Sequence, residues 1–226
     1  MGKNFILTAC AAVLAFAAVP ANASVTISQP VNSYNQPSLC GDTTGGCQTV
    51  YMGETFTAAI TGQLTNLQFT LGPSSALGSV YATVYAWNGT TITGSALWKS
   101  ANVAGSPNVL DFNPTGLNLT SGQTYVALLG TYGIAGNTGS AQVGSCNAFS
   151  TCTSTVSDPY LGYAVFGNLL SGNVQWSKTT NNYADLTFSA TITPVPEPAS
   201  WAMMVGGLGI VGGMLRNRRR LSARFA

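Results

Sequence analysis

The chain has 226 residues, of which only 6% are charged and none is histidine. Without histidine, Ser-His-Asp and Cys-His catalytic arrangements and histidine-ligated metal sites are excluded. The formal net charge of +2 comes from the chain ends, which carry Lys3 and five arginines. Residues 24–193 hold two lysines and five carboxylates, a formal charge of −3. Nucleic-acid binding needs clustered Lys and Arg on the folded part, so nucleic acid is excluded as a partner.

The amino-terminal segment has the pattern of a secretory signal. Lys3 precedes an apolar run over residues 5–19, and Pro20 is followed by Ala21-Asn22-Ala23. This pattern predicts a signal peptide over residues 1–23, cleaved after Ala23, and therefore export. The stretch Leu7-Thr8-Ala9-Cys10 has the form of a lipobox, so a lipoprotein is the alternative. Most of the apolar run follows Cys10, which disfavours lipidation.

Residues 24–193 are expected to form one extracytoplasmic domain. Their apolar residues alternate with polar ones, and clusters of Gly, Asn, Ser and Pro recur at short intervals, which is typical of β-strands and turns. The clearest strand runs over residues 80–87, with an aliphatic and an aromatic face, and the apolar segment 123–131 is expected to be a central strand. The predicted fold class is all-β: an antiparallel β-sandwich, jelly-roll-like.

Four cysteines fall inside this domain, an even number that suits an oxidising compartment. Four cysteines allow three pairings, all of which remain open. We favour Cys40–Cys47 and Cys146–Cys152, because each pair encloses a short polar stretch with loop character. Loops this small would pin local structure rather than hold the core together.

The carboxy-terminal segment 194–226 has three zones. Pro196-Glu197-Pro198 keeps the backbone extended, and the uncharged stretch after it predicts a transmembrane helix over about residues 199–215. Arg216, Arg218, Arg219 and Arg220 then form a basic stop-transfer cluster that the positive-inside rule places in the cytoplasm. The domain before Pro196 is therefore expected to face outward from the inner membrane.

This tail resembles the PEP-CTERM sorting signal of Gram-negative bacteria, in the variant Pro-Glu-Pro-x-x-Trp-Ala. The matching residues are Pro196, Glu197, Pro198, Trp201 and Ala202. The resemblance implies recognition by an exosortase, an intramembrane cysteine transpeptidase, with cleavage near the motif. It also implies delivery to the cell surface or an extracellular polysaccharide matrix, as in a biofilm. An unprocessed single-pass anchor is the alternative.

The domain itself also resembles a family, on looser patterns. The order of Gly53–Ala58, Gly62–Thr65, Val84–Gly89, Leu119–Tyr125 and Asp185–Phe188 looks like the ectodomain often found ahead of PEP-CTERM anchors. That ectodomain is similar to the jelly rolls of carbohydrate-binding modules. The resemblance implies the fold and, more weakly, a carbohydrate ligand.

An aromatic stripe is the candidate carbohydrate-binding site. Tyr81, Tyr85 and Trp87 share one face of the strand over residues 80–87, and aromatic rings exposed on a sheet can stack on sugar rings. The favoured alternative is that the rings are core. An exposed stripe would support binding to the cell's own exopolysaccharide.

The five carboxylates of the domain give one candidate cation site. The domain resemblance places Glu54 and Asp185 beside an early and a late strand of the jelly roll, where related modules sometimes hold structural calcium. Calcium at this pair is therefore the only cofactor prediction, with ordinary surface or edge-strand roles as the alternative. Asp42, Asp111 and Asp158 lie in no catalytic motif and are expected to be solvated or to cap turns.

Three functional hypotheses follow. The first is a non-enzymatic exported surface or matrix protein, sorted by an exosortase through its tail. The second is an exopolysaccharide-binding module. The third is a glycan hydrolase, which needs two carboxyl groups about 5–9.5 Å apart in an open cleft.

Overall fold

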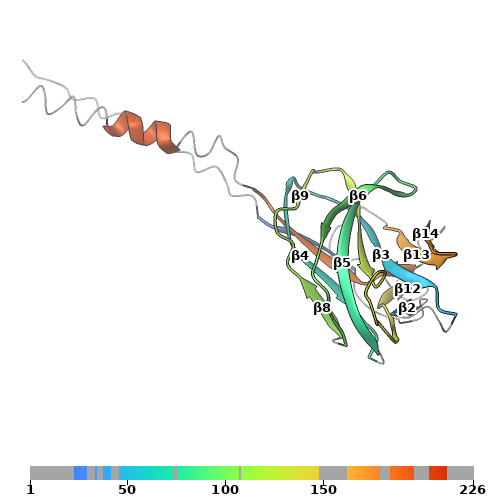
Figure 1. Cartoon of the computed structure of the whole chain (residues 1–226). Coiled ribbons are helices and arrows are strands. Elements are labelled where there is room, and N and C mark those ends of the chain that lie inside the picture. Colours follow the sequence, from blue (N-terminus) through green and yellow to red (C-terminus); the bar gives the residue numbers. More distant parts are fainter. Residues whose placement is uncertain are drawn as a thin grey trace, which may run out of the picture. The chain divides into compact units, whose positions relative to one another are not determined.

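The computed structural model describes residues 23–29, 34, 38–41, 46–73, 76–106, 108–147, 162–178, 184–195 and 204–212. Ala23–Val195 form one compact unit, and the elements described within it are all strands (Figure 1). The predicted signal peptide lies outside the described residues, apart from its last residue, Ala23.

Two larger sheets make up this unit. The five-stranded sheet has the order β1 (Val25–Ser28), β16 (Phe188–Thr193), β4 (Gly62–Thr70) and β8 (Val109–Phe112), with β9 (Asn118–Leu119) beside β4. The seven-stranded sheet has the order β14 (Asn173–Lys178), β13 (Ala164–Leu170), β3 (Thr49–Thr57), β10 (Thr124–Gly130), β5 (Leu77–Trp87) and β6 (Ile92–Lys99), with β7 (Val103–Gly105) beside β5.

Two short strand pairs complete the described strands. They join β2 (Ser38–Cys40) to β11 (Ser140–Gln142) and β12 (Ser145–Asn147) to β15 (Ala184–Leu186). All these pairings are antiparallel. The all-β, antiparallel prediction is confirmed, while the jelly-roll topology stays a prediction.

The main core lies between the two larger sheets, because its buried side chains come from both. β4 and β16 contribute Leu67 and Phe188, while β3 and β10 contribute Phe56 and Leu129. The ring of Phe56 lies 5.9 Å from that of Phe188, centroid to centroid, so the aromatic contact joins one sheet to the other. Alternation explains the arrangement, since residues two apart on a strand share a face.

The segment 123–131 is central, as predicted. It forms β10, which pairs with β3 on one side and β5 on the other. Val126, Leu128 and Ala127 are all fully buried, which is the pattern of a strand covered on both faces.

The seven-stranded sheet buries a second hydrophobic cluster on its other face. We call this cluster the outer core; its fully and partly buried members are Val50, Tyr51, Tyr81, Tyr85, Trp87, Ile92, Val126, Leu128, Ile134, Val165, Leu169, Val174 and Trp176. In a flat sheet, β14 and β5 would lie about 19 Å apart, four strand spacings. The ring centroids of Trp176 and Tyr85, one on each strand, are only 6.4 Å apart. The sheet is therefore curled, with its ends drawn together over the outer core.

The tail is described over residues 204–212, which are helical and mostly exposed. Within the described part of the chain, no helix is long and apolar enough to cross a membrane. The remainder of the predicted span over about 199–215 falls outside the described residues.

Candidate functional site

The aromatic stripe is not an exposed platform. Tyr81 and Trp87 keep 1% and 7% of their surface exposed, and Tyr85 is partly buried. The structure agrees with the favoured alternative that these rings are core, because the curling of the sheet folds this face inward as the outer core. Sequence alternation separated the two faces of β5 correctly, but it carries no information on curvature.

Hydrogen bonds also tie Tyr81 into the outer core. Its hydroxyl, which has a single proton to donate, lies 2.9 Å from two acceptors, the Tyr51 hydroxyl and the Tyr132 carbonyl oxygen. Burial and this contact with Tyr51 raise the pKa of Tyr81. The Lys99 ammonium covers the ring from outside, 3.7 Å from its centroid. One ring face and the polar tip of Tyr81 are thus engaged in contacts that stabilise the fold.

Glu54 and Asp185 are brought together by the fold, although 130 residues separate them in the chain. Glu54 lies on the core-facing side of β3 with no exposed surface, and Asp185 on β15 is 6% exposed. A Glu54 side-chain oxygen accepts a hydrogen bond from the Leu186 backbone amide at 2.8 Å, and Gln29 donates to Asp185 at 3.3 Å. Glu54 and Phe56 are two residues apart on β3, so Glu54 shares the core-facing side with Phe56. This alternation is the feature of the sequence that predicts the burial of Glu54.

Burial dominates the electrostatics of the pair. Loss of water raises the pKa of Glu54 well above its ordinary value, and the nearby Asp185 carboxylate raises it further. The Leu186 amide opposes both effects. The other side-chain oxygen of Glu54, Oε1, is buried and has no hydrogen-bond partner among the described residues. This arrangement either holds a proton on Glu54 or favours a cation beside it.

The donor set fits calcium in kind, since calcium prefers carboxylate and carbonyl oxygens. It does not fit in number, because calcium takes about six to eight oxygens and two carboxylates supply at most four. No group of three or more His, Cys, Asp or Glu side chains that could hold a metal is found in the described part of the chain. Glu54 and Asp185 would therefore need water or backbone carbonyls to complete a calcium site.

The same burial weakens the glycan hydrolase hypothesis. Glu54 has no exposed surface, so a sugar cannot reach the pair from solvent. Asp111 lies on the exposed face of β8, where Asn66 donates to it at 2.6 Å. Asp42 and Asp158 lie outside the described residues, so their predicted turn-capping or solvated roles stay predictions.

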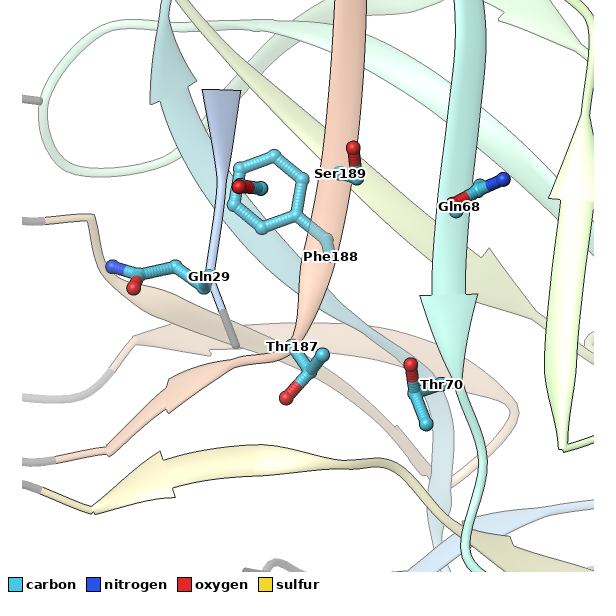
Figure 2. A pocket seen from close by; sticks show the side chains of 7 residues that line it. Gln29, Gln68, Thr70, Thr187, Phe188 and Ser189 are labelled. Carbon is cyan, nitrogen blue, oxygen red and sulfur yellow. The ribbon is translucent and has the colours of Figure 1, made fainter. Parts of the chain in front are cut away.

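A small open hollow lies on the outer face of the five-stranded sheet, with a volume of about 130 Å³. Figure 2 shows its side chains coming from β16, the end of β4 and the residue after β1. Its lining residues carry no charge: they are Ser28, Gln29, Gln68, Thr70, Thr187, Phe188 and Ser189. The hollow offers hydrogen bonds to a neutral group but no acid or base for catalysis.

The predicted disulfide Cys40–Cys47 is confirmed, with a Cα–Cα distance of 6.0 Å. It closes the loop after β2, and Cys40 is fully buried. Cys146 lies on β12, whereas Cys152 is outside the described residues, so the second predicted pair stays a prediction.

The predicted sorting residues Pro196, Glu197, Pro198, Trp201 and Ala202 and the arginine cluster lie outside the described residues, so their evidence comes from comparison with known proteins. Residues 194–220 match the family model of the PEP-CTERM protein-sorting motif. The match confirms the resemblance of the tail. No curated protein and no solved structure matches the chain.

Proposed function

We propose, from the PEP-CTERM protein-sorting motif that the chain carries at residues 194–220, that this protein is an exported surface or matrix protein processed by an exosortase. The motif implies an exosortase as partner, a transient membrane-anchored stage and later exposure at the cell surface. In this proposal the tail includes a transmembrane helix over about 199–215 and a cytoplasmic arginine cluster, and the cell is Gram-negative. Residues 1–23 act as the cleaved export signal.

The ectodomain is proposed to be non-enzymatic. The chain has no histidine, and the Glu54–Asp185 pair is buried beneath the sheets. Tyr81 and Trp87 were the main candidate residues for exopolysaccharide binding, and both are packed inside the outer core. The compact, disulfide-linked β unit is suited to a structural role outside the cell.

Replacing Pro196, Glu197 and Pro198 together by alanine tests the sorting proposal. The variant is expected to keep its full carboxy terminus, whereas the wild-type protein loses the tail and appears in the matrix at least about tenfold more abundantly. The reason is that the prolines hold the recognised segment extended and Glu197 is its only charge. Intact-mass spectrometry of the mature carboxy terminus, with fractionation of cells and matrix, provides the measurement.

Ser222→Ala is the control for this experiment, because Ser222 lies in the tail beyond the matched residues. It should be processed like the wild type. Full-length tails in all three proteins would contradict the sorting proposal.

Calcium binding at Glu54 and Asp185 is proposed as a secondary property of the ectodomain. Its support is the meeting of two buried carboxylates together with the unpartnered Glu54 Oε1. At about 100 times its Kd, calcium would stabilise the folded state by about 2.7 kcal/mol. Thermal unfolding at neutral pH should therefore show a higher Tm in calcium than in chelator for the wild type, but not for Glu54→Gln. An equal Tm for the wild type under both conditions would remove the proposal.

A further inference from the structure

The sorting motif begins very close to the end of the folded ectodomain. β16 ends at Thr193, and only Pro194 and Val195 separate it from Pro196. Three residues of fully extended chain reach at most about 11 Å. While β16 stays paired, the Cα atom of Pro196 therefore lies within about 11 Å of that of Thr193.

The end of β16 is held firmly in the sheet. Thr193 pairs with Gln63 of β4, and Ile192 pairs with Val25 of β1. Ile192 is also fully buried in the main core. Separating this end from the sheet would expose Ile192 to water, so the paired state is favoured.

The surface around this end is polar and uncharged. We call it the rim and define it as six exposed residues: Thr61, Asn118, Thr120, Ser121, Gly122 and Gln123. Gln63 pairs with Asn118, and the Ser121 amide donates to the Thr61 hydroxyl at 3.0 Å. These contacts link the end of β16 to the turn before β10.

The amino-terminal strand starts at the same end of the unit. Val25, the first residue of β1, lies opposite Ile192, near the end of β16. Figure 1 shows β1 (blue) and β16 (orange) side by side near β9. The opposite end is distant, because nine residues of β4 span about 26 Å at 3.3 Å per residue.

We infer that the rim is the surface of the ectodomain that contacts the exosortase while the motif is processed; this inference rests on the proposed function. An enzyme that takes up Pro196-Glu197-Pro198 must approach to within the short reach of the chain, and the rim lies beside the point where that chain leaves the sheet. Hydroxyl, amide and glycine groups permit this approach without the cost of desolvating a charge.

Photo-crosslinking from matched positions tests the contact. A photoreactive amino acid is placed at Asn118 or Gln123 on the rim. As controls it is placed at Asn108 or Gln142, whose carbonyl oxygens accept hydrogen bonds from Leu71 and Gly72 at the far end of β4, each at 2.7 Å. The full-length chain is expressed with a tagged exosortase whose nucleophilic cysteine is replaced, so that bound precursor accumulates. The rim positions should give at least about tenfold more adduct, identified by its tag and by mass spectrometry.

A linker variant separates contact from processing. Inserting about 12 Gly and Ser residues between Val195 and Pro196 adds a flexible span of roughly 20 Å. The rim adduct should then fall severalfold, while carboxy-terminal processing by the unmodified exosortase continues.

Each remaining outcome decides one of the two claims. Equal adduct from both ends, or none from the rim while precursor stays bound, would overturn the inference. If the unmodified exosortase leaves the wild-type tail intact, the proposed function itself fails.

Discussion

Tyr81→Ala is expected to lower the free energy of unfolding of the ectodomain by about 3–5 kcal/mol. The ring is almost completely buried in the outer core, and its removal leaves a cavity beside Tyr51 that rigid strands on both sides cannot fill. Equilibrium urea unfolding of the isolated residues 24–195, which form the compact unit, provides the measurement. A solvent-facing tyrosine would instead cost no more than about 0.5 kcal/mol.

Two controls separate the parts of this effect. Tyr81→Phe keeps the ring and loses the hydroxyl, so it should cost about 1–2 kcal/mol through the hydrogen bonds to Tyr51 and Tyr132. Tyr132→Ala removes a ring that is 42% exposed and keeps the backbone carbonyl that Tyr81 uses, so its effect should be smaller than that of Tyr81→Ala. Equal small effects for all three variants would show that the sheet is open over this face.

Glu54→Gln is expected to change how stability depends on pH. Burial raises the pKa of Glu54, so between its ordinary pKa of 4.5 and the raised value the folded state keeps a proton that the unfolded chain has lost. In that window the wild type loses stability as pH rises, by up to about 1.4 kcal/mol per pH unit. Below the ordinary pKa of Glu54 this loss of stability is absent, and above the raised pKa the loss has reached its full size. Glutamine does not titrate, so the stability of the variant relative to the wild type increases as pH rises.

Urea unfolding at about pH 4.5, 6 and 7.5, in chelator, measures this difference. Met52→Leu, a volume-conserving change on the same strand, removes no titrating group, so its stability relative to the wild type should stay constant with pH. A constant difference for Glu54→Gln as well would contradict the protonated carboxyl. A difference that disappears only when calcium is added would favour the cation proposal.

Several features follow from residues that are neighbours in the chain. Pro196-Glu197-Pro198, the uncharged stretch and the arginines are recognisable as a sorting signal because their order is itself the signal. Alternation identified β5 and separated its aromatic and aliphatic faces, and an apolar run identified β10 as a central strand. The spacing of Cys40 and Cys47 favoured their disulfide, since a short polar loop brings the two sulfurs together.

Other features depend on strands that are distant in the chain. The sequence placed Tyr81 and Trp87 on one face of β5, but only the curl of the seven-stranded sheet, which brings Trp176 to Tyr85, buried that face. The pairing of β12 with β15 and the packing around β3 brought Glu54 to Asp185, which sequence spacing could not do.

The sequence by itself determined the sorting tail, the β-strand pattern and the chemistry excluded by the lack of histidine. Those properties reside in composition and in short-range order. The tertiary structure decided which faces are buried, which carboxylates meet and that β1 begins where β16 ends. The physical reason is that the order and curvature of a sheet depend on how strands that are distant in the chain pair and pack. A local pattern of side chains does not determine which distant strands will meet.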